Sequence, residues 1–238
     1  MTPQAKIHNI YQTLLKAYGP QGWWPITVQG SRQSKTTNIK GYHPGVYHFP
    51  RDDIQKLEIA VGAILTQNTN WNNVVTALDS LASAGLFSMQ GLLHGKIGQI
   101  ALAIKSVGYY NQKAQYLNNL VRFLHRFPFQ KLERQATGVI REELLEIKGI
   151  GPETADCILL YALKKPSFVV DTYTRRIFSG LGMVSETVSY NSLKMLFESS
   201  LKKDLVVFQE YHALLVYHGK RYYSKKPYGN GDVILRSQ

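Results

Sequence analysis

Residues 144–171 read LLEIKGIGPETADCILLYALKKPSFVVD and carry the most specific structural pattern of the chain. The pattern predicts a helix, a tight turn over K-G-I-G, a second helix that begins at Pro152, and an aspartate, Asp171, after a short apolar run. Glycine reaches positive φ without a Cβ clash, so Gly149 and Gly151 are expected to supply the backbone freedom that the hairpin needs.

The turn is a candidate phosphate site. The first helix is expected to end at the apolar residue Ile147, and the N–H groups of residues 149–153 are expected to be free beside the positive end of the second helix. Contacts of this kind hold nucleic acid without reading its sequence. The residues predicted to contact the nucleic-acid backbone at this turn are Lys148, Gly149, Ile150, Gly151 and Thr154.

The block resembles the helix-hairpin-helix plus aspartate signature of the endonuclease III superfamily of DNA glycosylases. Within that superfamily the chain is most similar to the bacterial 3-methyladenine DNA glycosylases of the endonuclease III type, from about Trp23 to about Asp232. Six strings carry the resemblance in the family's order: Trp23-Trp24-Pro25, GAILTQNT at 62–69, GYYNQKA at 108–114, KGIGPETAD at 148–156, VVD at 169–171 and HGK at 218–220.

Helical periodicity dominates the rest of the chain, so an all-α fold is expected. The resemblance implies two helical lobes, a central bundle over 54–165 and a second lobe from 1–53 and 166–238, with the active site in the cleft between them. Apolar residues at helical spacing predict helices over residues 7–18, 56–66, 114–124 and 206–217, the last of them stopping at Gly219.

Residues 27–53 interrupt this pattern. They are rich in Ser, Thr, Gly and His, and they contain YHPGVYHFP, which predicts a long loop that can hold a short hairpin. In the subgroup that the chain resembles, the Trp-Trp-Pro element runs almost directly into the buried helix, so this segment reads as an insertion.

The composition favours a polyanionic partner. A net charge of +12 and a pI near 9.6 suit nucleic acid, and they also suit an acidic membrane surface. No apolar run of about 18 residues is present, so a soluble, intracellular chain is expected. The resemblance implies damaged double-stranded DNA as the partner, and a cytoplasmic, nucleoid-associated monomer is expected. One cysteine, Cys157, excludes an internal disulfide and any all-cysteine zinc or iron-sulfur site.

Asp171 is the candidate catalytic residue. Taken alone, an aspartate before Thr-Tyr-Thr is best read as a helix N-cap. Its place after the hairpin matches the family aspartate, which the resemblance implies stands beside the sugar of an everted nucleotide. There a carboxylate would stabilise the positive charge that builds as the base leaves, or activate water. The two roles are compatible.

Glu153 departs from the pattern of the bifunctional relatives, which carry a lysine at that position. A carboxylate cannot form the imine that leads to strand cleavage, so the resemblance implies a monofunctional enzyme. Glu153 also suits the first turn of its helix electrostatically. As a base-pocket candidate, it could favour a cationic base.

The C-terminal stretch HGKRYYSKKPYGNGD departs from the many relatives that carry four cluster cysteines there, so no cofactor is expected. Its basic and aromatic residues are equally compatible with DNA contact and with packing of the tail.

An aromatic base pocket is implied by the resemblance. Trp23, Trp24 and Pro25 would border it, and Trp71 would stack on the extruded base, with a cation-π contribution if that base is an alkylated, positively charged purine. Lys220 matches a lysine near the pocket. The alternatives are that one of the two tryptophans is a core residue and that the lysine contacts a phosphate.

Gln67 is the candidate for filling the hole that the everted base leaves, because its amide is a neutral donor and acceptor. Alternatively it orders the loop after the buried helix. Arg175, one turn beyond Asp171, is a candidate phosphate contact that could equally pair with a surface acid.

Metal chemistry is the weaker enzyme hypothesis. The seven histidines are scattered, mostly at expected surface or core-edge positions, and the paired acids Asp52-Asp53 and Glu142-Glu143 sit at expected helix starts. No metal site is therefore predicted.

The sequence predicts a monofunctional glycosylase for alkylated purines, 3-methyladenine above all. The alternatives are a glycosylase for uracil, mismatched thymine or oxidised purine, and a helix-hairpin-helix DNA-binding protein without catalysis. Asp171 argues against the last.

Overall fold

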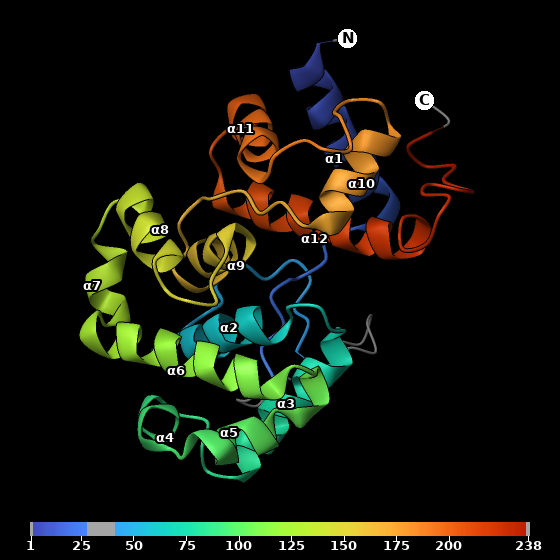
Figure 1. The fold of residues 1–238 in the computed structure, drawn as a ribbon. Coiled ribbons are helices and arrows are strands. Elements are labelled where there is room, and N and C mark those ends of the chain that lie inside the picture. The colour runs from blue at the N-terminus through green and yellow to red at the C-terminus, as the bar shows by residue number, and fades with distance from the viewer. Residues whose placement is uncertain (1, 28–40, 237–238) are drawn as a thin grey trace. The chain divides into compact units, whose positions relative to one another are not determined.

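The computed structural model describes residues 2–27 and 41–236. All regular structure within these two ranges is helical, which confirms the predicted all-α class. The chain divides into two compact units, whose helices are labelled in Figure 1. The terminal unit comprises residues 1–23, 43–47 and 166–238, and the central unit comprises residues 24–42 and 48–165. The lobe boundaries expected at residues 54 and 165 stay a prediction.

The terminal unit joins both chain ends around one long helix. Helices α1 and α10 pack against α12, and α11 packs against α1. Its core is aromatic: Phe168 and Phe197 stack with ring centroids 4.0 Å apart, and the buried Tyr211 hydroxyl donates to the Ile7 carbonyl at 2.8 Å. The helices are α1 (Pro3–Tyr18), α10 (Thr172–Gly180), α11 (Tyr190–Ser200) and α12 (Leu205–Tyr222).

The central unit is built around α2, which is buried along nearly its whole length and packs against α3, α6, α9 and η2. Within the described ranges, no helix combines the length and the apolar character that crossing a membrane requires. The elements are α2 (Asp53–Leu65), α3 (Trp71–Ser83), α4 (Met89–His94), α5 (Ile97–Ala103), η1 (Lys105–Val107), α6 (Tyr110–Arg126), α7 (Phe129–Glu133), α8 (Thr137–Leu145), α9 (Pro152–Cys157) and the π-helical η2 (Ile158–Ala162).

Short polar side chains begin most of the longer helices. Each accepts a hydrogen bond from an N–H group of the first turn, which would otherwise lack a partner. The N-cap residues of this kind are Thr2, Asp52, Asn70, Ser88, Asp171, Ser189 and Asp204.

The helices predicted over 7–18, 56–66 and 114–124 are confirmed as α1, α2 and α6. The stop predicted at Gly219 is wrong, because α12 continues to Tyr222. A Cβ at Gly219 would lie 2.4 Å from the Cβ of Tyr173 on α10. The glycine therefore allows two helices to approach closely instead of ending one of them.

Residues 28–40 of the predicted long loop lie outside the described residues. In its described part, YHPGVYHFP at 42–50 forms a turn, in which the Val46 N–H donates to the His43 carbonyl at 3.0 Å, and no strand. The two flanks of residues 28–40 meet, since the Ile26 N–H donates to the Gly41 carbonyl at 3.1 Å. The Thr27 hydroxyl donates to the buried Glu58 carboxylate on α2 at 2.6 Å, and the Thr27 N–H donates to the same oxygen. The start of the insertion is thus fixed to the central helix.

Candidate active site

The predicted site residues fall into both units. Asp171, Lys220, Trp23 and Arg175 belong to the terminal unit. The hairpin, Gln67, Glu153, Trp71 and the Trp24-Pro25 pair belong to the central unit, so the two groups are described separately.

Asp171 stands at the end of an extended segment, residues 166–170, and caps α10. Its Oδ1 accepts from the Thr174 N–H and from the Thr174 hydroxyl, each at 2.7 Å. The capping reading is therefore confirmed. The cap uses one oxygen only, and no described residue donates a hydrogen bond to Oδ2. A half-buried carboxylate thus keeps an acceptor available for a ligand.

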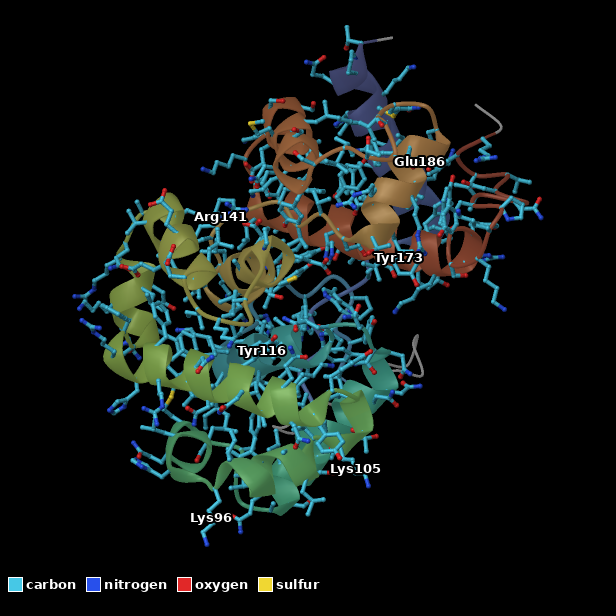
Figure 2. All side chains as sticks on the ribbon, in the orientation of Figure 1. Lys96, Lys105, Tyr116, Arg141, Tyr173 and Glu186 are labelled. Atoms are coloured by element: carbon cyan, nitrogen blue, oxygen red, sulfur yellow. The ribbon has the colours of Figure 1, made fainter. Side chains whose placement is uncertain are left out.

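The negative charge of Asp171 acts electrostatically on two side chains of α12, His212 and Lys220. His212 is only 4% exposed, and burial lowers the pKa of its imidazole, while the negative charge of Asp171 acts in the opposite direction. Desolvation by the surrounding protein also lowers the pKa of the Lys220 amine, again opposed by Asp171, although the lysine side chain reaches solvent. The close approach of Gly219 to Tyr173, which Figure 2 labels, brings α12 to this end of α10.

Trp23 joins this group through Lys220, whose Nζ lies 5.9 Å from the centroid of the Trp23 ring system. The residues before the tryptophan are fixed by the buried Glu210 of α12, which accepts from the Gln21 N–H at 2.8 Å and from the Gly22 N–H at 3.4 Å. The terminal unit thus brings together an aspartate, a lysine and an indole.

Arg175 lies on α10, one turn beyond Asp171, and is half-buried. Its Nε is buried and finds no hydrogen-bond acceptor among the described residues. The surface-acid pairing considered for it is not seen, because none of the ion pairs among the described residues involves Arg175.

The hairpin connects α8 to α9. Helix α8 ends at Leu145, so Ile147 belongs to the turn and not to the helix. Gly149 adopts φ 105°, as predicted, but Gly151 has φ −94° and serves as the extended N-cap before Pro152. The expected need for positive φ is thus wrong for Gly151, because a residue that caps a helix is extended.

Side chains from elsewhere in the central unit hold the hairpin's carbonyl oxygens. The Gln67 amide nitrogen donates to the Gly149 carbonyl at 3.0 Å and to the Thr154 hydroxyl at 3.1 Å. The Asn119 amide donates to the Lys148 carbonyl at 3.0 Å. These bonds fix the turn from the carbonyl side.

The sequence predicted that the N–H groups of residues 149–153 are free, but one of them is used within the turn. The Ile150 N–H donates to the Ile147 carbonyl at 2.9 Å, because this bond closes the turn. The Ile150 side chain is also buried, at 5% exposure. No described residue accepts from the N–H groups of Gly149 and Gly151. These two amides remain available for an anion.

An ion pair fixes the angle between the two hairpin helices. Arg141 on α8, labelled in Figure 2, donates through Nε to one oxygen of Asp156 on α9 at 2.9 Å, and through Nη2 to the other at 3.1 Å. Asp156 is completely buried. The bidentate geometry makes this a directional contact.

Replacing Gly149 by alanine is expected to destabilise the protein by about 1–3 kcal/mol, because a Cβ would be held at a strained φ. It would also lie 2.1 Å from the Tyr116 Cγ on α6. Thermal unfolding measures the effect. Gly151→Ala is the matched control, since a Cβ there meets no atom within 4 Å. Equal melting temperatures for the two variants would contradict this prediction.

Trp24, Pro25 and Trp71 are buried in the central unit. The Trp24 and Trp71 rings meet edge to face with centroids 5.5 Å apart, and the centroid of the Tyr161 ring also lies 5.5 Å from that of Trp24. Gly62 of α2 faces the Trp24 indole. Trp24 and Trp71 therefore form core contacts, whereas Trp23 keeps part of its surface and Glu153 is exposed on the first turn of α9.

Most of the histidines lie outside the core, as predicted, and the two exceptions are His212 and His218, which are buried. His218 Nδ1 lies 2.8 Å from the Tyr18 hydroxyl, and its Nε2 lies 3.0 Å from Asp232, which also accepts from Tyr223 at 3.0 Å. These contacts favour the tail-packing reading for Tyr223. In the described ranges, no group of three His, Cys, Asp or Glu residues is placed to hold a metal ion.

The structure adds two candidate functional residues that the sequence did not single out, Tyr109 and Lys113. Tyr109 is 72% exposed, and it adopts a left-handed φ of 46° that bulky residues rarely take. Lys113, in contrast, is 3% exposed on α6. Both lie in the GYYNQKA string, and nothing in residue type marks one as exposed and the other as buried.

A family model described as "HhH-GPD superfamily base excision DNA repair protein" matches residues 61–203. The chain is 39% identical over 225 residues to a Methanocaldococcus jannaschii protein named "Putative DNA repair glycosylase", covering 92% of this chain and 90% of the relative. It is also 28% identical over 177 residues to endonuclease III of Sulfolobus acidocaldarius, covering 73% and 77% of the two chains.

Solved structures show the same similarity. The H. pylori 3-methyladenine DNA glycosylase (MagIII), bound to 1,N6-ethenoadenine, matches with a TM-score of 0.68 and 25% identity over 93% of this chain and 98% of that one. A thermostable thymine-DNA glycosylase matches with a TM-score of 0.65 and 19% identity over 94% and 91% of the two chains, which shows a shared fold.

Proposed function

The chain belongs to the HhH-GPD superfamily of base excision DNA repair proteins and is a DNA glycosylase, and from this premise we propose its reaction and substrate class. It hydrolyses the N-glycosidic bond of an everted, alkylated purine such as 3-methyladenine, and it leaves the abasic strand intact. Its partner is double-stranded DNA that contains a damaged base, and it acts as a monomer.

Asp171 is the catalytic residue of this proposal. As the base leaves, positive charge develops on the deoxyribose, and a carboxylate beside the sugar stabilises that charge or activates the attacking water. The available Oδ2 supports the role, because capping of α10 occupies only Oδ1. This is the observation on which the proposal chiefly depends.

The proposal excludes strand cleavage through the hairpin position, because Glu153 stands where the bifunctional relatives carry a lysine. Strand cleavage begins when an amine attacks C1′ of the sugar, and the Glu153 side chain carries a carboxylate in place of that amine. The proposal must also consider the amine of Lys220, because the charge of Asp171 acts on its pKa. We assign Lys220 to the pocket wall beside Trp23 and not to covalent chemistry.

The free amides of Gly149 and Gly151 would bind one phosphate of the damaged strand, and the exposed Lys148 would add charge. Arg175, which belongs to the terminal unit, would bind a second phosphate of the DNA. Ile150 and Thr154 would act by shaping the turn, since both are buried.

Gln67 would leave its two hydrogen bonds to the hairpin and enter the duplex where the base has left. The amide can replace part of the lost pairing without burying a charge. Because Gln67 contacts the hairpin before DNA binds, phosphate binding and entry of this side chain would be linked.

The preference for alkylated purines rests on two features. A cationic base is a good leaving group and gains from stacking on an indole, for which the half-buried Trp23 is available. In addition, the structurally similar H. pylori protein bound to 1,N6-ethenoadenine is a 3-methyladenine DNA glycosylase. Trp24, Pro25 and Trp71, which the resemblance also assigns to a base pocket, are packed within the central unit.

The test is a panel of duplexes that carry methylated purines, 1,N6-ethenoadenine, uracil, a G·T mismatch or 8-oxoguanine. Free base is measured first, and strand breakage is then measured with and without alkali. We expect 3-methyladenine to be released fastest, with breakage only after alkali. Release of another base in preference would replace the substrate class, and binding without release of any base would refute catalysis.

Borohydride trapping tests the absence of lyase chemistry. Wild-type enzyme should form no covalent adduct with DNA, because no amine attacks C1′. An adduct that is formed by the wild type and lost in Lys220→Met would overturn the monofunctional assignment and place the nucleophile at Lys220.

A further inference from the structure

Lys113 is a buried amine whose hydrogen-bond partners are backbone groups. It lies near the start of α6 and is 3% exposed. Its Nζ donates to the Leu65 carbonyl at 2.9 Å and to the Val107 carbonyl at 3.0 Å. Among the described residues, no acid forms an ion pair with it. A lysine in the interior without an acid is costly to bury, so its retention calls for a reason.

Both carbonyl groups belong to helix ends. Leu65 is the last residue of α2, and Val107 is the last residue of η1. Carbonyl oxygens at a C-terminus lack intrahelical partners and carry the negative end of the helix dipole. One ammonium group therefore caps two helices at once and holds their ends beside each other.

Each capped helix leads directly into a loop with a candidate DNA-contacting side chain. Residues 66–70 follow α2 and carry Gln67, whose amide reaches the hairpin. Gly108 and Tyr109 follow η1, and the Tyr109 side chain is exposed in a left-handed conformation. Ser106 of η1 also donates to the Asn73 carbonyl of α3 at 2.8 Å, so η1 is bonded as well to the helix that follows residues 66–70.

We propose that Lys113 is a positioning residue for base eversion, because its ammonium group fixes the spacing between the loop that carries Gln67 and the loop that carries Tyr109. The inference rests on the proposed function, because that function supplies the base-release reaction in which the two loops would act. It adds a residue that touches neither the base nor the sugar and acts only through the backbone of these loops.

Burial lowers the pKa of the Lys113 amine to about 8, and burial is the sole cause of the shift. No charged neighbour contributes. The titratable residues of α6 itself and of the elements packed against it are Tyr110, Tyr116, Arg122, His125 and Arg126 on α6, Asp53, Lys56 and Glu58 on α2, His94 on α4 and Lys105 on η1.

The decisive experiment compares Lys113→Met, which keeps the side-chain length but has neither charge nor donor, with wild type. The first probe is a duplex with a tetrahydrofuran abasic site next to 2-aminopurine, whose fluorescence rises when stacking is disrupted. The second is single-turnover release of base from methylated duplex DNA. Lys96→Met, at an exposed lysine of the same unit that Figure 2 labels, is the control for loss of one positive charge.

We expect Lys113→Met to bind the tetrahydrofuran duplex within about twofold of wild type, to give a smaller fluorescence rise, and to release base about 10- to 100-fold more slowly, as misplaced groups do. Lys96→Met should match wild type. Equal fluorescence and equal rates for Lys113→Met would overturn the inference. If wild type releases no methylated base, the proposed function fails, but the fluorescence comparison still decides the role of Lys113.

A stability measurement keeps the inference testable if activity is lost through misfolding. The folded state holds the proton with a pKa near 8, against 10.5 for an ordinary lysine. Between these values the unfolded chain binds more protons, so the free energy of unfolding of wild type should rise with pH relative to Lys113→Met. The gain is complete above pH 10.5 and absent below pH 8. A pH-independent difference would refute the burial on which the inference depends. Lys113→Gln, which keeps an N–H donor, serves as the second variant.

Discussion

Replacing Asp171 by asparagine is expected to slow base release by about 100- to 1000-fold, the loss seen when one group aimed at a developing charge is removed. Asparagine keeps a side-chain oxygen, so the bond from the Thr174 N–H, 2.7 Å in the wild type, can persist. It is as good an N-cap as aspartate. The variant therefore removes the charge and keeps the helix start. Single-turnover release of base, with melting temperature measured alongside, checks the result.

A matched control is available in the same unit. Asp204 caps α12 and accepts from the Val206 N–H at 2.8 Å and from the Val207 N–H at 3.1 Å. Asp204→Asn removes one negative charge from an N-cap in the same way, but it should leave base release unchanged. Full activity of Asp171→Asn, or an equal loss in both variants, would show that Asp171 is a capping residue only.

Replacing Arg141 by methionine is expected to destabilise the protein by about 3–5 kcal/mol, because the carboxylate of Asp156 would remain buried without its charge partner. Asp156 is 0% exposed, whereas 19% of the Arg141 side chain is exposed. The loss should also loosen the angle between α8 and α9 and so weaken binding of the abasic duplex. Chemical denaturation measures the free energy of unfolding, and fluorescence anisotropy measures binding.

The control for this prediction is Arg134→Met, which removes a positive charge from an exposed position of the same unit. It should change stability by less than about 0.5 kcal/mol. The double variant Arg141→Met/Asp156→Asn removes the buried charge as well, so it should be no less stable than the single variant. Additive losses would mean that the two side chains contribute independently.

Much of the fold follows from local patterns. The helices over 7–18, 56–66 and 114–124 were predictable because a helix buries one face, and that requirement repeats every three to four residues. Pro152 at the start of α9 and Asp171 at the start of α10 follow from the N–H groups that every helix start leaves unpaired. Gly219 shows the limit of this reasoning. A glycine often ends a helix, but this one lies within α12 and lets α10 approach closely.

Much less of the candidate site could be predicted. The K-G-I-G string indicates a turn, but the Ile150 amide closes it while the amides of Gly149 and Gly151 stay open. That difference depends on the path of the backbone. Lys113 could not be found at all, because its partners are carbonyl groups, which every residue carries.

Five features could be read from local residues or counts alone: the all-helical class, the hairpin, the cap at Asp171, the carboxylate at position 153 and a cysteine count too low for an all-cysteine cluster. Each of these depends on the residues at a few neighbouring positions or on a count. The packed helices were needed to show which amides remain open, which tryptophan keeps exposed surface, and that the charge of Asp171 acts on Lys220 and His212. Burial and electrostatic interactions depend on distances between residues far apart in the chain, and those distances exist only once the helices have packed.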